Sequence, residues 1–141
     1  MLLRPADKKE TLRHYLKKLR EILNSDEMPM NGEGISKSGS NNPIPSEPGV
    51  YVIRRKGTGQ CVWVGMSKDL YHRIWTQHRN GWESSDLQKV VTKKIPQQND
   101  KSARKWIEKH CMVRWMVIRN EKERSSCEHF FTAMLKPQWA K

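Results

Sequence analysis

Two charged residues, Arg73 and Glu128, stand where the sequence pattern predicts the edge of an apolar helix stripe. Arg73 comes three residues after Leu70, and Glu128 comes three residues before Phe131. A charged group beside a buried stripe costs free energy unless it is paired or used. Three interpretations are therefore open: the two side chains pair with each other, they point into solvent, or they take part in chemistry. Arginine suits phosphate oxygens, and a carboxylate suits a hard divalent metal.

The segment before Arg73 is predicted to form a β-hairpin. Alternating apolar residues fill 49–55 (GVYVIRR), and a returning run follows at 61–65 (CVWVG). The turn between them, KGTGQ, has two glycines that supply positive φ angles. A turn centred near Gly57 would place Tyr51 opposite Trp63 on one face of the sheet.

The other elements around the hairpin are predicted from their periodicity. Ser67 is expected to cap the helix that carries Arg73. Further helices are expected over residues 84–95, 101–110 and 122–135, with a strand over 111–119. The order β-β-α-α-α-β-α favours an α+β fold, with a small three-stranded antiparallel sheet flanked by helices.

The chain is predicted to have three parts. Residues 1–24 contain an amphipathic helix, with apolar side chains recurring every three or four positions over 7–24. Residues 25–48 are rich in Gly, Pro, Ser and Asn, which predicts a linker or long loop. Residues 49–141 are the expected compact domain. The N-terminal helix either packs on that domain or binds a protein partner or a second copy.

The charge of the chain favours a polyanionic partner. The net charge is +12, and residues 49–141 carry +11 of it, from 19 basic and 8 acidic side chains. Nucleic acid is the expected partner, with solubility alone as the other interpretation. No run of 18 apolar residues predicts a membrane span, and no secretory signal is expected. Three cysteines without CxxC spacing favour reduced thiols in a cytoplasmic or nuclear protein.

An ordered set of short motifs resembles the GIY-YIG endonucleases. The motifs are GVY at 49–51, WVG at 63–65, SKDLYHRI at 67–74 with Arg73 eight residues after Gly65, and Glu128 followed by LKPQW at 135–139. The resemblance covers about residues 49–141. It implies a three-stranded antiparallel sheet with helices around it, and divalent-metal-dependent hydrolysis of DNA phosphodiester bonds.

The resemblance also implies roles for individual residues. Tyr51 would activate or orient the attacking water, and Arg73 would hold the phosphate. Glu128 would be the single protein ligand of Mg²⁺, with Mn²⁺ as an alternative metal. Trp63 stands where the family has its second tyrosine; it lacks an ionisable hydroxyl but can pack the site wall or donate one hydrogen bond.

Two further positions depart from the family pattern. The family often has a histidine four residues after the arginine, where this chain has Gln77. His78, one residue later, is a candidate helper, although α-helical geometry would turn it about 100° away from the direction of Gln77. His72 is another candidate helper. The family's C-terminal asparagine would fall at Ala140.

These departures keep two other functions open. One is a nucleic-acid-binding module with a weakened or inactive site, and the other is an RNA-directed or regulatory domain. Substrate contacts are expected from basic residues near or after the arginine helix: Lys68, Arg79, Lys89, Lys93 and Lys94. Trp75 and Trp82 are candidates for stacking on bases.

Overall fold

The computed structural model describes residues 5–32, 42–79, 85–96 and 99–139. The elements follow in the order α1 (Pro5–Leu23), β1 (Met28–Pro29), β2 (Gly49–Arg55), β3 (Cys61–Ser67), the π-helix η1 (Tyr71–Arg79), α2 (Asp86–Lys94), α3 (Asp100–His110), β4 (Cys111–Val117) and α4 (Glu121–Leu135). The last three helices and the three long strands lie close to where the sequence pattern places them. The described structure contains no helix long and apolar enough to cross a bilayer.

The strands form one antiparallel sheet in the order β1-β4-β2-β3. The predicted α+β fold, an antiparallel sheet flanked by helices, is confirmed. The sheet has four strands, not three, because Met28 and Pro29 pair with the outer edge of β4. Two residues, one of them a proline, leave no alternating pattern from which a strand could be predicted.

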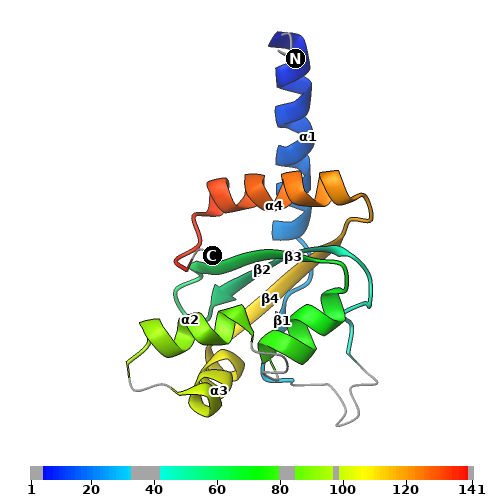
Figure 1. Cartoon of the computed structure of the whole chain (residues 1–141). Coiled ribbons are helices and arrows are strands. Elements are labelled where there is room, and N and C mark those ends of the chain that lie inside the picture. The colour runs from blue at the N-terminus through cyan, green and yellow to red at the C-terminus, as the bar shows by residue number, and fades with distance from the viewer. Residues whose placement is uncertain (1–4, 33–41, 80–84, 97–98, 140–141) are drawn as a thin grey trace.

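Helices cover both faces of this sheet (Figure 1). Tyr51 and Ile53 of β2 join the core cluster under η1, α2 and α3, whereas Val50 and Val52 join the cluster under α1 and α4. β2 is therefore buried on both sides, which its near-continuous apolar sequence suits. One helix from each layer, η1 below the sheet and α4 above it in Figure 1, contributes residues to the candidate site described below.

The β2–β3 hairpin has a different register from the predicted one. Tyr51 pairs with Gly65, and Trp63 pairs with Ile53. The prediction that Tyr51 lies opposite Trp63 is wrong by two residues, although both side chains do lie on one face of the sheet. One residue of the difference comes from an irregularity between Ile53 and Arg54. The other comes from the turn, which is centred after Gly57, because Arg54 pairs with Cys61.

The described parts of the segment predicted as a linker, 25–32 and 42–48, pack against the sheet. Met30 and Ile44 are buried in the core under η1. The carbonyl groups of Pro45 and Glu47 accept hydrogen bonds from the first turn of the arginine helix, at Tyr71 (3.0 Å) and Leu70 (2.9 Å). The start of that helix is thus fixed by residues that lie just before β2.

The two ends of the described chain have different surroundings. The second half of α1 packs on α4 through Leu19 and Ile22, while its first half projects from the body (Figure 1) and Leu12 is half exposed. The partner or dimer contact through residues 1–24 stays a prediction. At the other end, the N–H groups of Gln138 and Trp139 donate to the carbonyls of Cys61 and Val62 on β3. Ala140 lies outside the described residues.

Candidate active site

Tyr51 is fully buried on β2, and its side chain lies against Gly65 of the neighbouring strand. A Cβ atom at Gly65 would be 2.4 Å from the Tyr51 hydroxyl oxygen and 2.5 Å from Cζ. Any other residue at position 65 would therefore displace the tyrosine. This close approach explains why the second strand of the hairpin ends its apolar run with glycine.

His78 lies beside Tyr51, although α-helical geometry would turn it away. Its Nε2 atom is 2.7 Å from the Tyr51 hydroxyl oxygen. α-Helical geometry does not apply here, because the segment is a π-helix. In a π-helix, residues five apart in the sequence lie about one turn apart, on the same side of the helix. His78, five residues after Arg73, takes the direction that the fourth residue would take in an α-helix.

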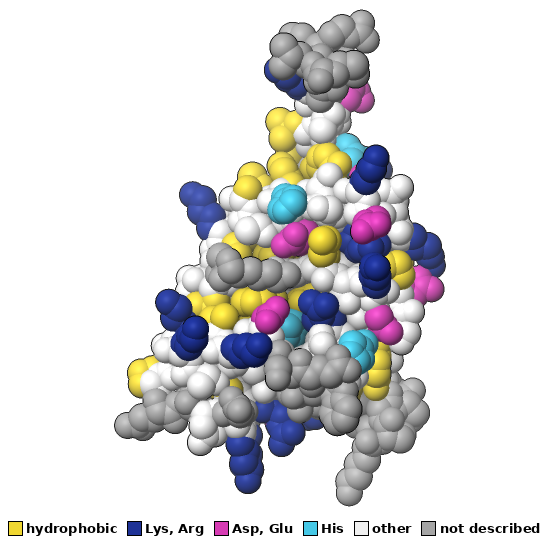
Figure 2. All heavy atoms as spheres, viewed as in Figure 1, with side chains coloured by type: hydrophobic (Ala, Val, Ile, Leu, Met, Phe, Trp, Pro, Cys, Tyr) yellow, Lys and Arg dark blue, Asp and Glu magenta, His cyan; other side chains and the backbone are white. Residues whose placement is uncertain are grey.

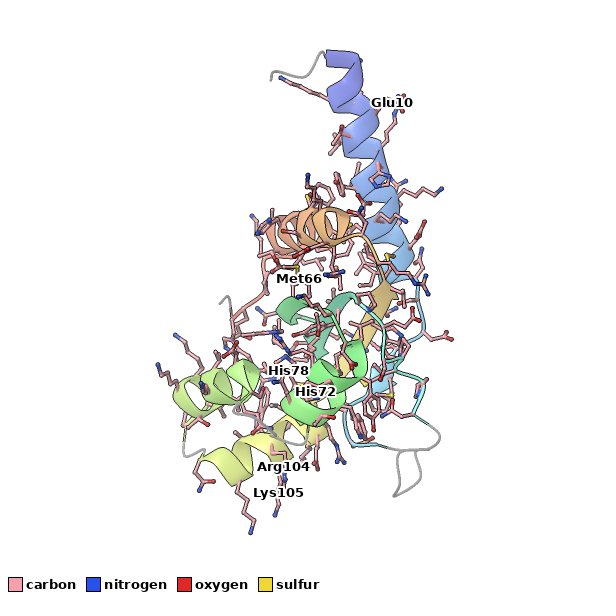
Figure 3. The ribbon with its side chains drawn as sticks, turned by 45° about the vertical axis from the view of Figure 1, so that its right-hand side comes forward. Glu10, Met66, His72, His78, Arg104 and Lys105 are labelled. Atoms are coloured by element: carbon pink, nitrogen blue, oxygen red, sulfur yellow. The ribbon has the colours of Figure 1, made fainter. Side chains whose placement is uncertain are left out.

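The His78 ring is enclosed and held on its other nitrogen by α2. The ring Nδ1 is 2.5 Å from the Ser85 hydroxyl oxygen, and Ser85 also caps α2 by accepting the Gln88 N–H. Gln88 Nε2 donates to the His78 carbonyl (2.9 Å). His78 is only 1% exposed, and Figure 3 shows it on the side of η1 toward the sheet and α2. Its ring orientation is therefore fixed by both neighbours.

Burial raises the pKa of Tyr51 to about 12. The nearby Trp63 indole and the positive charge of Arg73 both oppose this rise in pKa, so both groups lie close to the hydroxyl. The Trp63 ring also stands edge-on to His78, with centroids 6.0 Å apart. Trp63 thus forms part of the wall around Tyr51. The hydroxyl keeps its proton at neutral pH, since its pKa lies far above 7.

The raised pKa of Tyr51 predicts a loss of stability at alkaline pH. The folded state holds the proton more tightly than the unfolded state, whose tyrosine titrates near 10. The stabilisation is complete below pH 10 and is lost as the pH rises toward the folded pKa of about 12. Between about pH 9 and pH 11, we expect the wild type to lose about 1 kcal/mol more unfolding free energy than Tyr51→Phe.

Urea denaturation at the two pH values measures this difference. Burial also raises the pKa of Cys61 and Cys127 to about 11 and that of Cys111 to about 12. These thiols destabilise both proteins alike, so the Tyr51→Phe variant isolates the tyrosine. An equal loss in the two proteins would show that Tyr51 is not held neutral by the fold.

Arg73 is placed on η1 with its guanidinium toward Tyr51. Its Nε atom is buried and has no hydrogen-bond partner in the described part of the chain. Within residues 5–32, 42–79, 85–96 and 99–139, Arg73 and Glu128 form no ion pair. The interpretation that they neutralise each other is therefore wrong. A buried guanidinium N–H without an acceptor is costly, which favours a functional role.

A cavity of about 380 Å³ opens beside Arg73, between the end of β3, the start of η1 and the start of α4. Its lining residues are Met66, Ser67, Lys68, Asp69, His72, Arg73, Glu121 and Arg124. In Figure 3, Met66 lies between α4 and η1, and His72 lies on η1. The cavity is large enough for part of a ligand, and several charged groups converge on it.

Asp69 accepts a backbone N–H group in the first turn of η1, whereas the sequence predicts Ser67 as the cap of this helix. Asp69 Oδ1 accepts the backbone N–H of His72 (3.0 Å), and the Ser67 hydroxyl binds the Asp69 backbone. His72, the second candidate helper, therefore lies at the cavity wall with its backbone held in place. Lys68, a predicted phosphate contact, is exposed and also lines the cavity.

Glu128 lies on α4 with its side chain 14% exposed, and its one described ionic neighbour is His129 at 3.9 Å. It follows Glu121 and Arg124 at helical spacing, so it shares their side of α4. The described residues hold no group of three or more His, Cys, Asp or Glu side chains that could bind a metal. The single carboxylate of Glu128 suits Mg²⁺, which takes few carboxylates and keeps waters, and would not make a structural Zn²⁺ site.

The other predicted DNA contacts lie outside the cavity. Lys89, Lys93 and Lys94 are exposed on α2, where Figure 2 shows dark-blue side chains at the lower left. Arg79 is held within the fold: it donates to the carbonyls of Met30 and Asn31 (3.2 and 3.3 Å) and lies 3.5 Å from Glu108.

The suggestion that Trp75 stacks on bases is wrong. The indole is 7% exposed in the core, and the Arg79 guanidinium lies over its ring at 4.7 Å. A base could not reach this ring without opening η1. Trp82, the other candidate for stacking, lies outside the described residues.

Three polar residues lie near the site that the sequence motifs do not indicate. Arg124 and Glu121 line the cavity, and Ser85 holds the His78 ring. The spacing of Arg124, four residues before Glu128, is a signal that could have found it. The contact of Ser85 with His78 has no such signal, because it depends on how α2 packs against η1.

Comparisons with known proteins find similar chains among the solved structures. A scan against protein-family models gives no match, and a search of curated proteins gives none either. Solved structures similar to this chain include the N-terminal GIY-YIG endonuclease domain of UvrC from Thermotoga maritima in several forms. A magnesium-bound form is 21% identical with a TM-score of 0.44, covering 70% of this chain and 89% of that chain.

Two point mutants of the same domain, each bound to its catalytic divalent cation, give similar values. One is 22% identical, with a TM-score of 0.47 and coverage of 70% of this chain and 89% of that one. The other is 20% identical, with a TM-score of 0.46 and coverage of 70% and 88%. All three structures are forms of one domain, and each covers 70% of this chain.

Proposed function

We propose that this chain is a divalent-metal-dependent endonuclease that hydrolyses DNA phosphodiester bonds. The observation that supports the proposal best is the arrangement around Tyr51. Its hydroxyl lies 2.7 Å from His78 Nε2, close to the charge of Arg73, and Arg73 lines a cavity on a basic domain. Arg73 thus connects the cavity, where a phosphate would bind, with the buried Tyr51–His78 pair.

Tyr51 and His78 act as a pair in the proposed reaction. The tyrosine is neutral at pH 7, because its pKa is about 12, so it cannot begin as a tyrosinate. It can accept a proton from an attacking water only while passing its own proton on. His78 Nε2, within hydrogen-bond distance, is the acceptor for that proton. Ser85 keeps the ring in the orientation that this transfer needs.

Arg73 binds the phosphate and stabilises the negative charge that develops during attack. Its guanidinium offers parallel N–H groups that match two phosphate oxygens. The buried Nε, which lacks an acceptor in the described structure, would gain one from a phosphate. Glu128, which is on the same side of α4 as the cavity residues Glu121 and Arg124 but does not itself line the cavity, would hold the Mg²⁺ or Mn²⁺. When bound, the metal supplies charge stabilisation for the phosphate and for the departing 3′ oxygen.

The test is a cleavage assay on supercoiled plasmid and on branched and single-stranded DNA oligonucleotides, with Mg²⁺, Mn²⁺ or EDTA. We expect metal-dependent nicking by the wild type. The double variant Arg73→Met/Glu128→Gln, purified in the same way, should show no nicking and so reports contamination. Nicking that persists in EDTA or in the double variant would contradict the proposal.

A second candidate is a nucleic-acid-binding module with an inactive site. It is favoured by Trp63, which is 1% exposed and has no ionisable hydroxyl where the family has tyrosine. An RNA-directed domain would give the same result with RNA as the ligand. Salt-sensitive binding without cleavage of any DNA substrate would support the binding module.

A further inference from the structure

Arg124 is a buried arginine on the wall of the cavity that α4 contributes, and no sequence motif drew attention to it. Its side chain is 6% exposed, and it lines the same cavity as Arg73 of η1. It has no carboxylate partner in the described part of the chain. A buried guanidinium without an anion is costly to the fold, which suggests that an anion binds there.

The hydrogen bonds of Arg124 account for only one of its nitrogens. Nη1 donates to the carbonyl groups of Ile118 (3.2 Å) and Arg119 (3.3 Å), and so fixes the loop that leads into α4. Nε and Nη2 have no acceptor among the described residues, and neither is sealed from solvent as Arg73 Nε is. Since Arg124 lines the cavity, its Nε and Nη2 nitrogens can donate hydrogen bonds to a ligand there.

The charges around the cavity favour an anion between the two arginines. Lys68, Arg73 and Arg124 are basic, and Asp69 and Glu121 are acidic. Asp69 already accepts the N–H of His72, and Glu121 is exposed in the first turn of α4. The two guanidinium groups come from opposite layers of the fold, so a ligand that meets both must pass between η1 and α4.

We propose that Arg124 binds a second phosphate of the nucleic-acid strand, adjacent to the phosphate at Arg73. The strand's backbone then runs through the cavity between η1 and α4. A cavity of about 380 Å³ is large enough for part of the sugar-phosphate backbone of one strand. The inference rests on the proposed function for the identity of the ligand, but it concerns binding and needs no cleavage.

The test is a binding measurement in EDTA, which separates binding from hydrolysis. Fluorescence anisotropy with a labelled single-stranded DNA oligonucleotide gives the affinity over a range of salt concentrations. We expect Arg124→Gln to lower the slope of log affinity against log salt by about 0.7, the value for one lost phosphate contact on a single strand. Arg119→Gln is the matched control, because Arg119 is 74% exposed and pairs with Glu47 outside the cavity. Arg119→Gln should keep the wild-type slope.

An unchanged slope in Arg124→Gln, or an equal loss in the Arg119 control, would overturn the proposal. If Arg124→Gln does not fold, NMR of the wild type decides instead. The Nε–Hε resonance of Arg124, assigned with Arg124→Lys, should shift when the oligonucleotide is added. A shift of the Arg73 resonance without one for Arg124 would also overturn it. A protein that binds with the expected slope but never cleaves would disprove the proposed nuclease and leave this inference standing.

Discussion

We expect the Glu128→Gln variant to cleave DNA at least about 10³-fold more slowly than the wild type, since a bound metal supplies several kcal/mol of transition-state stabilisation. Glutamine keeps the shape of the side chain but removes the charge that attracts Mg²⁺. The described residues around Glu128 offer no three-ligand metal site that could take over. Plasmid nicking rates at saturating Mg²⁺ measure the effect.

The matched control for Glu128→Gln is Glu121→Gln. Glu121 lies on the same side of α4, lines the cavity and is exposed in the first turn of the helix. We expect this control to retain most of the activity. The affinity for Mn²⁺, followed by electron paramagnetic resonance, should fall in Glu128→Gln alone. If the Glu121 variant loses both metal and activity while Glu128→Gln keeps them, the metal ligand has been assigned to the wrong carboxylate.

The sequence was sufficient to predict the α+β plan and the positions of its main helices and strands, because its periodicities are strong. The strand pair at 49–55 and 61–65 and the helix at 122–135 carry clear apolar patterns, and both appear nearly at their predicted positions. The short strand β1 and the packing of Met30 and Ile44 were not predictable, since they arise from contacts between distant segments. Composition alone predicts a linker or long loop for that segment.

The position of His78 depended on a feature that periodicity does not report. Counting residues on an α-helix directed it away from Arg73, whereas the π-helix brings it to Tyr51. The residue types of the site could thus be named from the sequence, but the direction of one side chain could not. π-Helical turns occur often at functional sites, where they re-aim a residue at some cost in helix stability. The π-helical geometry of η1, which directs His78 toward Tyr51, is consistent with that use.

Arg73→Met is expected to separate activity from stability. Methionine retains the apolar stem of the side chain and removes the guanidinium, including the buried Nε that lacks an acceptor in the described structure. Removing an unsatisfied buried donor should leave the unfolding free energy unchanged or raise it by about 1 kcal/mol. Cleavage should fall by about 10³-fold or more, as when a cation that stabilises a phosphoryl transition state is removed.

Two measurements on the same samples test this prediction: urea denaturation and the rate of DNA cleavage. Arg119→Met, a change at an exposed arginine paired with Glu47, should alter neither. Arg73→Lys should restore part of the activity, because lysine keeps the charge but not the two parallel N–H groups. A large loss of stability in Arg73→Met would mean that Arg73 mainly supports the fold. Unchanged or higher stability with lost cleavage would mean that the chain keeps a costly buried charge for the phosphate it binds.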